Sequence, residues 1–329
     1  MFFENLPRIN LQEFPTPLEL LPRFGEAIGH SRLYIKRDDV MSIGLGGNKI
    51  RNLEFWLGEA KRQNVDLILA AGGLQSNQCR LTAAAAAKLG LECVLVHNDT
   101  KPDKLEGNQL LNYLFGAKSV FLGTISEQER QIKMELLAET YREQGRRPYL
   151  IGDPGLGALG YAAAAAELKE QSTQLGIALK HVVIVGSMCI TAAGFAFGTA
   201  LSEADFHVHV ISVEYSLQEM IDRCKTIWEQ AKMVCGQSPK HNLEDIASFY
   251  DDYLGSGYAI PTRESIKTIL LLARLEGILL ENVYMAKTLY GLTDLISRGI
   301  LPPEEAVCFV HTGGIGALFS QSSFFQSQE

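Results

Sequence analysis

A lysine at the start of a predicted helix is the side chain best suited to nucleophilic chemistry in this chain. Lys49 follows a turn in which Gly46 and Gly47 let the backbone approach a ligand closely. Apolar residues at helical spacing begin directly afterwards, at Ile50 and Leu53. Unpaired N–H groups give a helix N-terminus a partial positive charge, so this position disfavours a protonated amine. Two states stay open for Lys49: a solvated surface ammonium, or a neutral, nucleophilic amine with a lowered pKa.

Three loops of small and hydroxyl residues each follow a predicted apolar strand and precede a predicted helix. They comprise residues 75–78, 186–191 and 311–314. At the carboxyl edge of a parallel sheet, such loops gather free N–H groups at the positive ends of helices, which favours anions. Any one of these loops is also what an ordinary strand–helix turn requires. Taken with Lys49, they favour a ligand that carries both a phosphate and a carboxylate group.

The common motifs for nucleotide binding and for metal binding are missing from the sequence. No GxGxxG with an acidic ribose partner follows the first predicted strand, and no GxxxxGK[ST] occurs, so dinucleotides and P-loop nucleotides are poorly supported. The six cysteines lack CxxC spacing and are expected to be free thiols in a reducing cytoplasm. The seven histidines show no HExxH pattern. We therefore expect no metal site.

Composition predicts a globular protein with small-molecule partners. A chain of 329 residues with 47% hydrophobic content can fill a sizeable core. The formal net charge of −8, without a long run of lysine or arginine, argues against a nucleic-acid or anionic-membrane surface. Glu4 interrupts a short apolar start that lacks the features of a signal peptide, and no apolar run reaches transmembrane length. We expect a cytoplasmic protein that binds neither nucleic acid nor membrane.

The elements that must position these residues are apolar strands that alternate with helices. Strands are predicted at residues 33–37, 66–71, 92–97, 119–122, 148–151, 181–185, 208–213 and 306–310. Helices are predicted at residues 18–28, 108–115, 128–144, 192–201, 217–234 and 262–276, and others follow Lys49, Gln78, Gly160 and Gly314. Residues 152–160 and 251–258 are expected to form loops. Continuously apolar strands are typical of parallel sheets buried on both faces, so the expected fold class is α/β with three αβα layers.

A series of short motifs resembles the family of D-cysteine desulfhydrases and 1-aminocyclopropane-1-carboxylate (ACC) deaminases. In chain order they are Pro15-Thr-Pro-Leu, Tyr34-Ile-Lys-Arg-Asp-Asp39, Gly46-Gly-Asn-Lys49, Gly72-Gly-Leu-Gln-Ser-Asn-Gln78, Ala158-Leu-Gly160, Gly257-Tyr258, Val283-Tyr284 and His311-Thr-Gly-Gly314. The resemblance covers nearly the whole chain. It implies the two-domain pyridoxal-phosphate (PLP) fold type II, that of the tryptophan synthase β chain. Residues 1–50 and 161–329 would form the larger, PLP-binding domain, and residues 51–160 the smaller, mobile one.

The resemblance also implies how the cofactor is held. Lys49 would join its amine covalently to the aldehyde of PLP, and Asn77 would hydrogen-bond the ring oxygen. Thr312 would lie near the pyridine nitrogen. The phosphate would be bound by the loop of Gly186, Ser187, Met188, Cys189, Ile190 and Thr191. PLP would then act as the electron sink, while the protein aligns the bond to be broken and transfers protons.

Substrate contacts follow from the resemblance in the same way. Ser76, Asn77 and Gln78 would take the carboxylate of a small amino acid. Tyr258 and Tyr284 would line the substrate face as hydrogen-bonding or acid–base groups. From the residues alone, the two tyrosines could equally be half-buried with satisfied hydroxyls, and Ser76 could be a helix cap, a role compatible with ligand binding.

Two departures from the family pattern leave the substrate open. In the family the phosphate loop is mostly Gly, Ser and Thr; here Met188, Cys189 and Ile190 lose hydroxyl donors and positive-φ freedom, and a β-branched residue at 190 excludes left-handed geometry. The second departure is Met285, where ACC deaminases usually carry a glutamate that can hold the pyridine nitrogen protonated and D-cysteine desulfhydrases a small hydroxyl residue, so Met285 matches neither branch. Thr312 favours the desulfhydrases and Gln78 the deaminases.

The leading hypothesis is a PLP-dependent lyase or deaminase. For D-cysteine, α,β-elimination would release pyruvate, ammonia and sulfide. ACC ring opening and deamination is the alternative within the same class. An alternative of another class is a PLP-fold homologue that has lost catalysis and acts as a binding protein, motivated by the altered loop and Met285. The resemblance also implies a homodimer.

Overall fold

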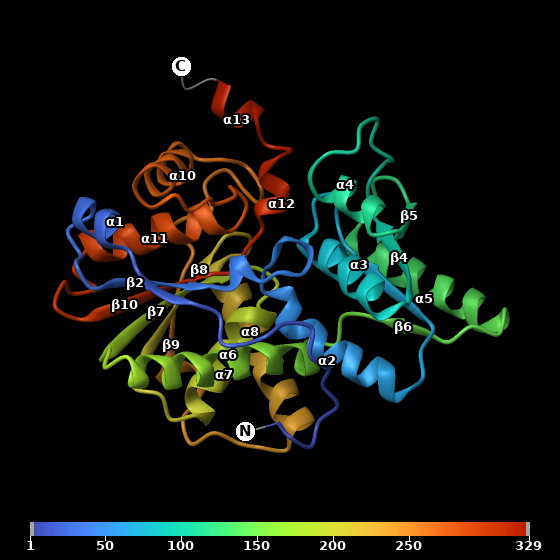
Figure 1. Ribbon diagram of the computed structural model, residues 1–329, viewed down its shortest axis with the longest axis horizontal. Coiled ribbons are helices and arrows are strands. Elements are labelled where there is room, and N and C mark those ends of the chain that lie inside the picture. Colours follow the sequence, from blue (N-terminus) through green and yellow to red (C-terminus); the bar gives the residue numbers. More distant parts are fainter. Residues whose placement is uncertain (1–2, 327–329) are drawn as a thin grey trace.

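The computed structural model describes residues 3–326, which form two β-sheets covered by helices (Figure 1). The six-stranded sheet has the order β1-β2-β10-β7-β8-β9, and the four-stranded sheet β5-β4-β3-β6. The strands are β1 (Leu18–Leu20), β2 (Leu33–Arg37), β3 (Leu67–Ala71), β4 (Glu92–His97), β5 (Lys118–Phe121), β6 (Pro148–Leu150), β7 (Leu179–Gly186), β8 (His207–Ser212), β9 (Ala247–Tyr250) and β10 (Ala306–His311).

The helices alternate with these strands as the sequence predicts. They are α1 (Pro22–Ala27), α2 (Lys49–Arg62), α3 (Asn77–Leu89), α4 (Gly107–Leu114), α5 (Glu127–Glu143), α6 (Pro154–Gln174), α7 (Ile190–Leu201), α8 (Leu217–Cys235), α9 (Leu243–Ile246), α10 (Arg263–Glu276), α11 (Met285–Ser297), α12 (Ile315–Leu318) and α13 (Ser323–Gln326). Two 3-10 turns, η1 (Asp38–Val40) and η2 (Ile43–Leu45), precede α2.

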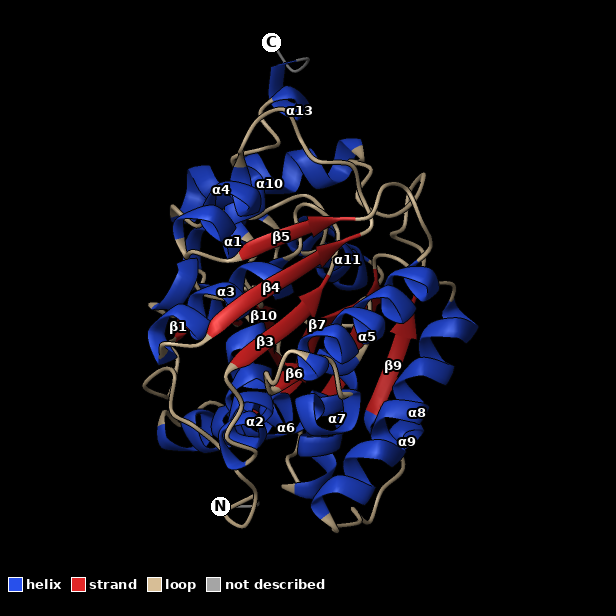
Figure 2. Cartoon of the chain, turned by 90° about the vertical axis from the view of Figure 1, so that its right-hand side faces the viewer, coloured by secondary structure: helices blue, strands red, loops and turns tan. Residues whose placement is uncertain are grey.

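Both sheets are built mainly from parallel strands. Strand β1 pairs with β2 in antiparallel fashion, whereas β2, β10, β7, β8 and β9 run parallel. Figure 2 shows β5, β4 and β3 of the second sheet side by side and pointing the same way. The carboxyl ends of parallel strands meet at one edge of each sheet, so the loops that follow them lie together.

The six-stranded sheet is buried on both faces. Val182 and Ile184 of β7 belong to a hydrophobic cluster that includes residues of α6, α7 and α8. The alternating residues, Val183 and Val185, belong to a second cluster with residues of α10 and α11. Figure 1 shows these two groups of helices on opposite sides of the sheet. The predicted three-layer α/β architecture is confirmed.

All four strands of the second sheet come from residues 67–150, and α2 packs against both α3 and α6 between the two sheets. This arrangement agrees with a smaller domain whose sequence is inserted within the sequence of a larger domain. The predicted domain limits at residues 50/51 and 160/161 stay a prediction.

The expectation of a loop at residues 152–160 is wrong for most of that stretch. Helix α6 begins at Pro154, where Asp153 accepts a hydrogen bond from the N–H of Leu156 (2.9 Å) and proline fits the first helical position. The glycines serve packing rather than turning: a Cβ at Gly157 would overlap the ring of Trp56, and a Cβ at Gly160 the backbone of Arg51.

Three further differences concern short or unusually capped elements. Residues 18–28 form strand β1 and helix α1, because Pro22 starts a helix at its first position. Strand β9 is a four-residue edge strand inside a stretch without clear alternation. Helix α11 was missed because the residue before it, Tyr284, is not a standard N-cap.

Close packing between α6 and α7 predicts a stability effect. A Cβ at Gly198 would overlap the carbonyl oxygen and Cα of Ala162. Gly198→Ala is therefore expected to lower the free energy of unfolding by about 1–3 kcal/mol through overpacking, although alanine is the better helix former. Urea unfolding measures this, with exposed Gln174→Ala on α6 as control. An unchanged or raised midpoint for Gly198→Ala would show that the helices separate at no cost.

Within residues 3–326, no helix has the length and apolar character needed to span a membrane. In the same part of the chain, no group of His, Cys, Asp and Glu residues is arranged to hold a metal ion.

Candidate active site

Lys49 is the first residue of α2 and is half-buried. Burial lowers the pKa of its amine to about 8, against the opposing charge of Glu214. Within the described residues the amine has no hydrogen-bond partner. This environment favours the second of the two states left open by the sequence, an amine that is readily neutral.

The turn before Lys49 lies against the loop after β10. The N–H of Asn48 donates to the carbonyl of Thr312 (2.9 Å), and Gly47 forms an isolated bridge with Gly313. Both glycines have positive φ, and a Cβ on Gly313 would lie 2.6 Å from Cα of Gly47. Only glycine permits this approach, which brings Lys49 and Thr312 to one place.

The loop predicted to hold phosphate leads into the N-terminus of α7. The left-handed residue is Cys189 (φ 64°), and Ile190 is the first helical residue, where a β-branched side chain is tolerated. The expected obstacle at position 190 therefore does not arise; the backbone strain falls on Cys189 instead. The first N–H groups of α7 lack partners within the helix, as at every helix start. The loop keeps a helix N-terminus suited to an anion.

Two hydroxyls flank this helix start. Thr191 Oγ1 accepts a hydrogen bond from Nδ2 of Asn48 (2.8 Å), which leaves its own proton to donate. Ser187 Oγ instead donates to the carboxylate of Glu214. Burial raises the pKa of Glu214, against the hydrogen bond from Ser187. Glu214 was missed in the sequence, although a charged residue just beyond the carboxyl end of β8 is a usable signal.

The loop after β3 supplies a second helix N-terminus. Ser76 caps α3 by accepting from the N–H of Cys79 (3.2 Å), so its predicted capping role is present. Asn77 Oδ1 accepts from Nδ2 of Asn108 (3.0 Å), which leaves the Asn77 amide nitrogen as a donor. Gln78 Nε2 donates along the helix to Thr82 (3.1 Å).

Tyr258 and Tyr284 lie together although they are far apart in the sequence. Their hydroxyls are hydrogen-bonded, and their ring centroids are 5.9 Å apart. Burial raises the pKa of Tyr258 to about 12 and also raises the pKa of Tyr284. Both hydroxyls therefore stay protonated at neutral pH and can donate.

Helix α11 holds this pair through two buried charged residues that sequence reasoning missed. The Glu281 carboxylate accepts from the N–H groups of Val283 (2.6 Å), Tyr284 and Met285 (both 2.8 Å) and so caps the helix. Lys287 Nζ donates to the carbonyls of Leu254 (2.7 Å) and Gly257 (2.8 Å) in the loop that carries Tyr258. Burial raises the pKa of Glu281 to about 7.

Met285 packs beneath Thr312. Its sulfur accepts the N–H of Thr312 (3.2 Å) and lies 3.5 Å from the Thr312 hydroxyl. Met285 is fully buried. A neutral thioether therefore stands beside the residue that the resemblance places near the pyridine nitrogen.

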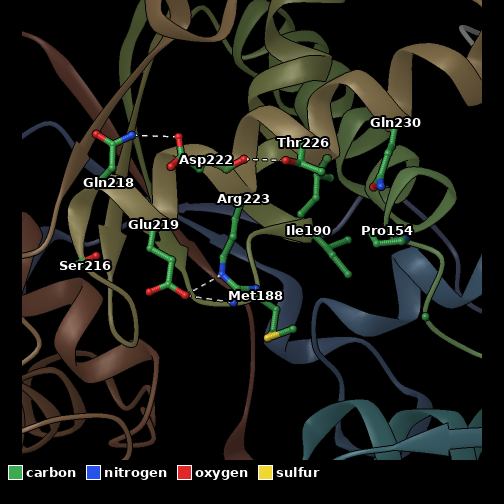
Figure 3. A pocket seen from close by; sticks show the side chains of 12 residues that line it. Pro154, Met188, Ile190, Ser216, Gln218, Glu219, Asp222, Arg223, Thr226 and Gln230 are labelled. Atoms are coloured by element: carbon green, nitrogen blue, oxygen red, sulfur yellow. Dashed lines mark hydrogen bonds and ion pairs between the residues drawn. The ribbon is translucent and has the colours of Figure 1, made fainter. Parts of the chain in front are cut away.

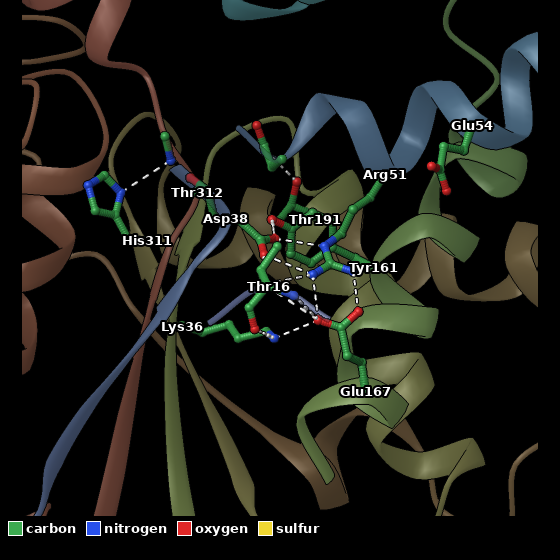
Figure 4. A network of polar contacts seen from close by, with 12 residues as sticks. Thr16, Lys36, Asp38, Arg51, Glu54, Tyr161, Glu167, Thr191, His311 and Thr312 are labelled. Atoms are coloured by element: carbon green, nitrogen blue, oxygen red, sulfur yellow. Dashed lines mark hydrogen bonds and ion pairs between the residues drawn. The ribbon is translucent and has the colours of Figure 1, made fainter. Parts of the chain in front are cut away.

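A buried ionic network supports α2 from below the site (Figure 4). Arg51, two residues after Lys49, binds Asp38 through Nε and Nη2 (both 2.8 Å) and Glu167 through Nη1 (2.9 Å). Lys36 joins Glu167 at 2.5 Å. Burial opposes ionisation, but the charge of Arg51 lowers the pKa of Asp38 to about 2. The network ties β2, α2 and α6 together.

A cavity of about 710 Å³ lies next to the phosphate loop (Figure 3). It is lined by the start of α6, by Met188 and Ile190, and by polar residues of α8. Of the predicted site residues, Met188 and Ile190 alone line this cavity. The candidate active site is therefore the cluster around Lys49, and this cavity is its neighbour.

The residues of the cluster fit PLP. The amine of Lys49 is readily neutral, α7 offers N–H donors and the Thr191 hydroxyl to a phosphate, and Asn77 offers an amide donor. The N-terminus of α3 remains for a carboxylate.

Comparisons with known proteins point to one family. The family model "Pyridoxal-phosphate dependent enzyme" matches residues 9–313. D-cysteine desulfhydrases of Salmonella choleraesuis (strain SC-B67) and Salmonella paratyphi C (strain RKS4594) are each 38% identical over 322 residues, 95% of this chain and 96% of the relative. A solved ACC deaminase homologue has a TM-score of 0.89 at 32% identity, covering 98% of this chain and 97% of its own.

More distant structures share the fold alone. O-ureido-L-serine synthase, at 20% identity, has a TM-score of 0.65 and covers 92% of this chain and 90% of its own. The predicted family, fold class and cofactor are confirmed by these matches. The chain belongs to the family of pyridoxal-phosphate dependent enzymes.

Proposed function

We propose that this enzyme is a D-cysteine desulfhydrase-type lyase. It would convert D-cysteine and water into pyruvate, ammonia and sulfide. The observation that carries the proposal is the 38% identity, over nearly the full length of both chains, to proteins of that name. The uncharged contact between Met285 and Thr312 supports it, because no carboxylate stands where the ACC deaminases usually carry one.

The geometry supports the following proposed roles. When bound, PLP supplies the electron sink for breaking the bond at the substrate Cα. The α3 N-terminus, with Ser76 and the N–H groups of Asn77 and Gln78, binds the substrate carboxylate. Lys49 Nζ, with its lowered pKa, takes the proton from Cα. The neutral Tyr258 and Tyr284 pair donates a proton to the departing sulfur.

ACC ring opening and deamination is the second candidate. Gln78 and the solved ACC deaminase homologue at 32% identity favour it. A catalytically inactive PLP-binding homologue is the candidate of another class, favoured by the loss of hydroxyls at Met188 and Ile190.

A product screen of the PLP-loaded enzyme distinguishes these candidates. D- and L-cysteine, ACC, D-serine and β-chloro-D-alanine are each incubated with enzyme, and keto acid and sulfide are measured separately. Sulfide and pyruvate from D-cysteine, with no keto acid from ACC, are the expected result. Keto acid from ACC alone would transfer the assignment to the deaminase. No turnover by an enzyme that carries its cofactor would favour the inactive homologue.

We also propose the organisation that the resemblance implies: a cytoplasmic homodimer whose smaller domain, residues 51–160, moves against the rest. The confinement of the four-stranded sheet to residues 67–150 supports the domain division. Exposed apolar side chains at Tyr113, Leu114 and Phe319 support association. Light scattering of the purified protein tests the dimer.

The hydrogen bonds of Lys287 lead to a further prediction about activity. Lys287→Ala removes both hydrogen bonds to the loop of Tyr258, and this misplacement is expected to lower kcat by about 100-fold. Added ethylammonium should restore part of the rate, because it can refill the space and donate to the same carbonyls. Exposed Lys133→Ala is the control. An unchanged kcat would mean that the loop is held by other contacts.

A further inference from the structure

Glu214 is an acidic group in contact with residues 186–191, the loop expected to bind phosphate. It lies two residues beyond the end of β8, is half-buried, and accepts the hydroxyl proton of Ser187. Ser187 belongs to the loop at the N-terminus of α7. A carboxylate and a phosphate dianion would therefore compete for the Ser187 hydroxyl.

The groups around Glu214 offset a second negative charge only in part, because Lys49 and Arg223 are cationic but Glu127 is acidic. The charged or titratable groups that act on or with Glu214 are Lys49 of α2, Glu127 of α5, Arg223 of α8, the adjacent Tyr215, and the pair Tyr258 and Tyr284. Arg223 is already engaged: its guanidinium lies 3.9 Å from the ring centroid of Tyr215. It also lies 3.2 Å from Glu219, as Figure 3 shows.

The loop has also lost donors. Met188, Cys189 and Ile190 offer no hydroxyl, and the hydroxyl proton of Ser187 is already directed at Glu214. A protonated carboxyl group would remove the second negative charge and would also replace a lost donor. It can accept from Ser187 and donate its own proton to a phosphate oxygen. Burial raises the pKa of Glu214, which makes this proton easier to hold.

We propose that Glu214 binds the phosphate group of the cofactor as a neutral carboxylic acid, so that binding takes up one proton and weakens as pH rises. In this step a phosphate dianion and the Glu214 carboxylate combine with one proton from solvent, and no covalent bond changes. The inference rests on the proposed phosphate-binding role of residues 186–191.

The test uses pyridoxine 5′-phosphate, which has no aldehyde and so binds without a covalent link to Lys49. Its Kd is measured from about pH 7.5 to about 9, where the phosphate, with a second pKa near 6, is already a dianion. Three proteins are compared: wild type, Glu214→Gln, and Glu143→Gln as an exposed control on α5.

The ratio of the wild-type Kd to the Glu214→Gln Kd is expected to rise by up to about 10-fold per pH unit, because glutamine keeps a donor at every pH. Glu143→Gln should follow wild type. Pyridoxine without phosphate should give a constant ratio. A constant ratio for the phosphorylated compound would overturn the inference, as would an equal rise for pyridoxine.

A second measurement uses the Lys49→Ala protein, because the Lys49 amine titrates near pH 8 and could itself take up a proton. Calorimetry of this variant in two buffers of different ionisation enthalpy reports proton uptake directly. Uptake of close to one proton per ligand at about pH 8 is expected, since the free phosphate carries none there; no uptake overturns the inference. If neither PLP nor its analogue bound at any pH, both the proposed function and the inference about Glu214 would be wrong. Tight, pH-independent binding would contradict the role of Glu214 alone.

Discussion

Lys49→Ala is expected to lose the covalent link to PLP and to lower kcat by about 10³-fold or more, a loss of the kind seen when an enzyme's nucleophile is removed. Lys49 lies at the start of α2 with a pKa lowered by burial to about 8, so its amine is more often neutral than that of a surface lysine. A neutral amine is the form that attacks an aldehyde.

Borohydride reduction followed by peptide mass spectrometry measures the link. PLP-loaded wild type should carry the added mass on the peptide that contains residue 49, and Lys49→Ala should not. Because the amine must lose its proton, the yield for wild type is expected to rise as pH increases through about 8. Exposed Lys61→Ala, at the other end of α2, should behave as wild type. Labelling that stays equal in Lys49→Ala would assign the link to another lysine.

The meeting of distant loops could be predicted from the sequence because it depends on strand direction. Residues 186–191 follow β7 and residues 311–314 follow β10, and these two strands are adjacent and parallel. Loops after such strands must emerge at the same edge of the sheet. The contact between Asn48 and Thr312, which brings Lys49 to this edge, follows from the glycines on both sides of it.

The contacts of Glu281, Lys287 and Glu214 could not be predicted in the same way, although the place of Glu214 just beyond β8 was a usable signal for a site. Each acts through partners that only the folded chain supplies: helix-start N–H groups, carbonyls of a loop about 30 residues away, or a hydroxyl on another strand's loop. In the sequence they look like surface charges, which is what isolated Glu and Lys residues usually are.

The glycines of α6 were assigned a role that they do not have. Gly157 and Gly160 read as turn residues because glycine is favoured in turns, but the preceding Asp153 and Pro154 start a helix and the glycines make room for Trp56 and Arg51. Which use a glycine serves depends on the neighbour that approaches it, and a single sequence does not contain that neighbour.

Arg51→Ala is expected to have the largest effect on stability. Arg51 and Asp38 are each 1% exposed, and Glu167 also binds the same guanidinium. Removing Arg51 leaves two carboxylates in the interior with only Lys36 to balance them. Breaking a buried ion pair from one side costs about 3–5 kcal/mol, so the free energy of unfolding should fall by that amount.

Urea unfolding of Arg51→Ala, compared with exposed Arg142→Ala, measures this cost. Arg142 pairs with Glu139 on the surface of α5, and its loss should change stability by at most about 1 kcal/mol. The pH dependence gives a second check. The pKa of Asp38 is lowered to about 2, so its contribution is present at neutral pH and is lost as pH falls from about 4 toward 2.

In Arg51→Ala this acid-induced loss should shrink, because without the guanidinium the pKa of Asp38 is no longer held down. A small change in stability together with an unchanged acid profile would mean that the network contributes little. A large loss with the expected profile would show that the paired charges of Arg51 anchor α2, the helix that begins with Lys49. The position of the reactive amine would then depend on a network that itself makes no contact with substrate.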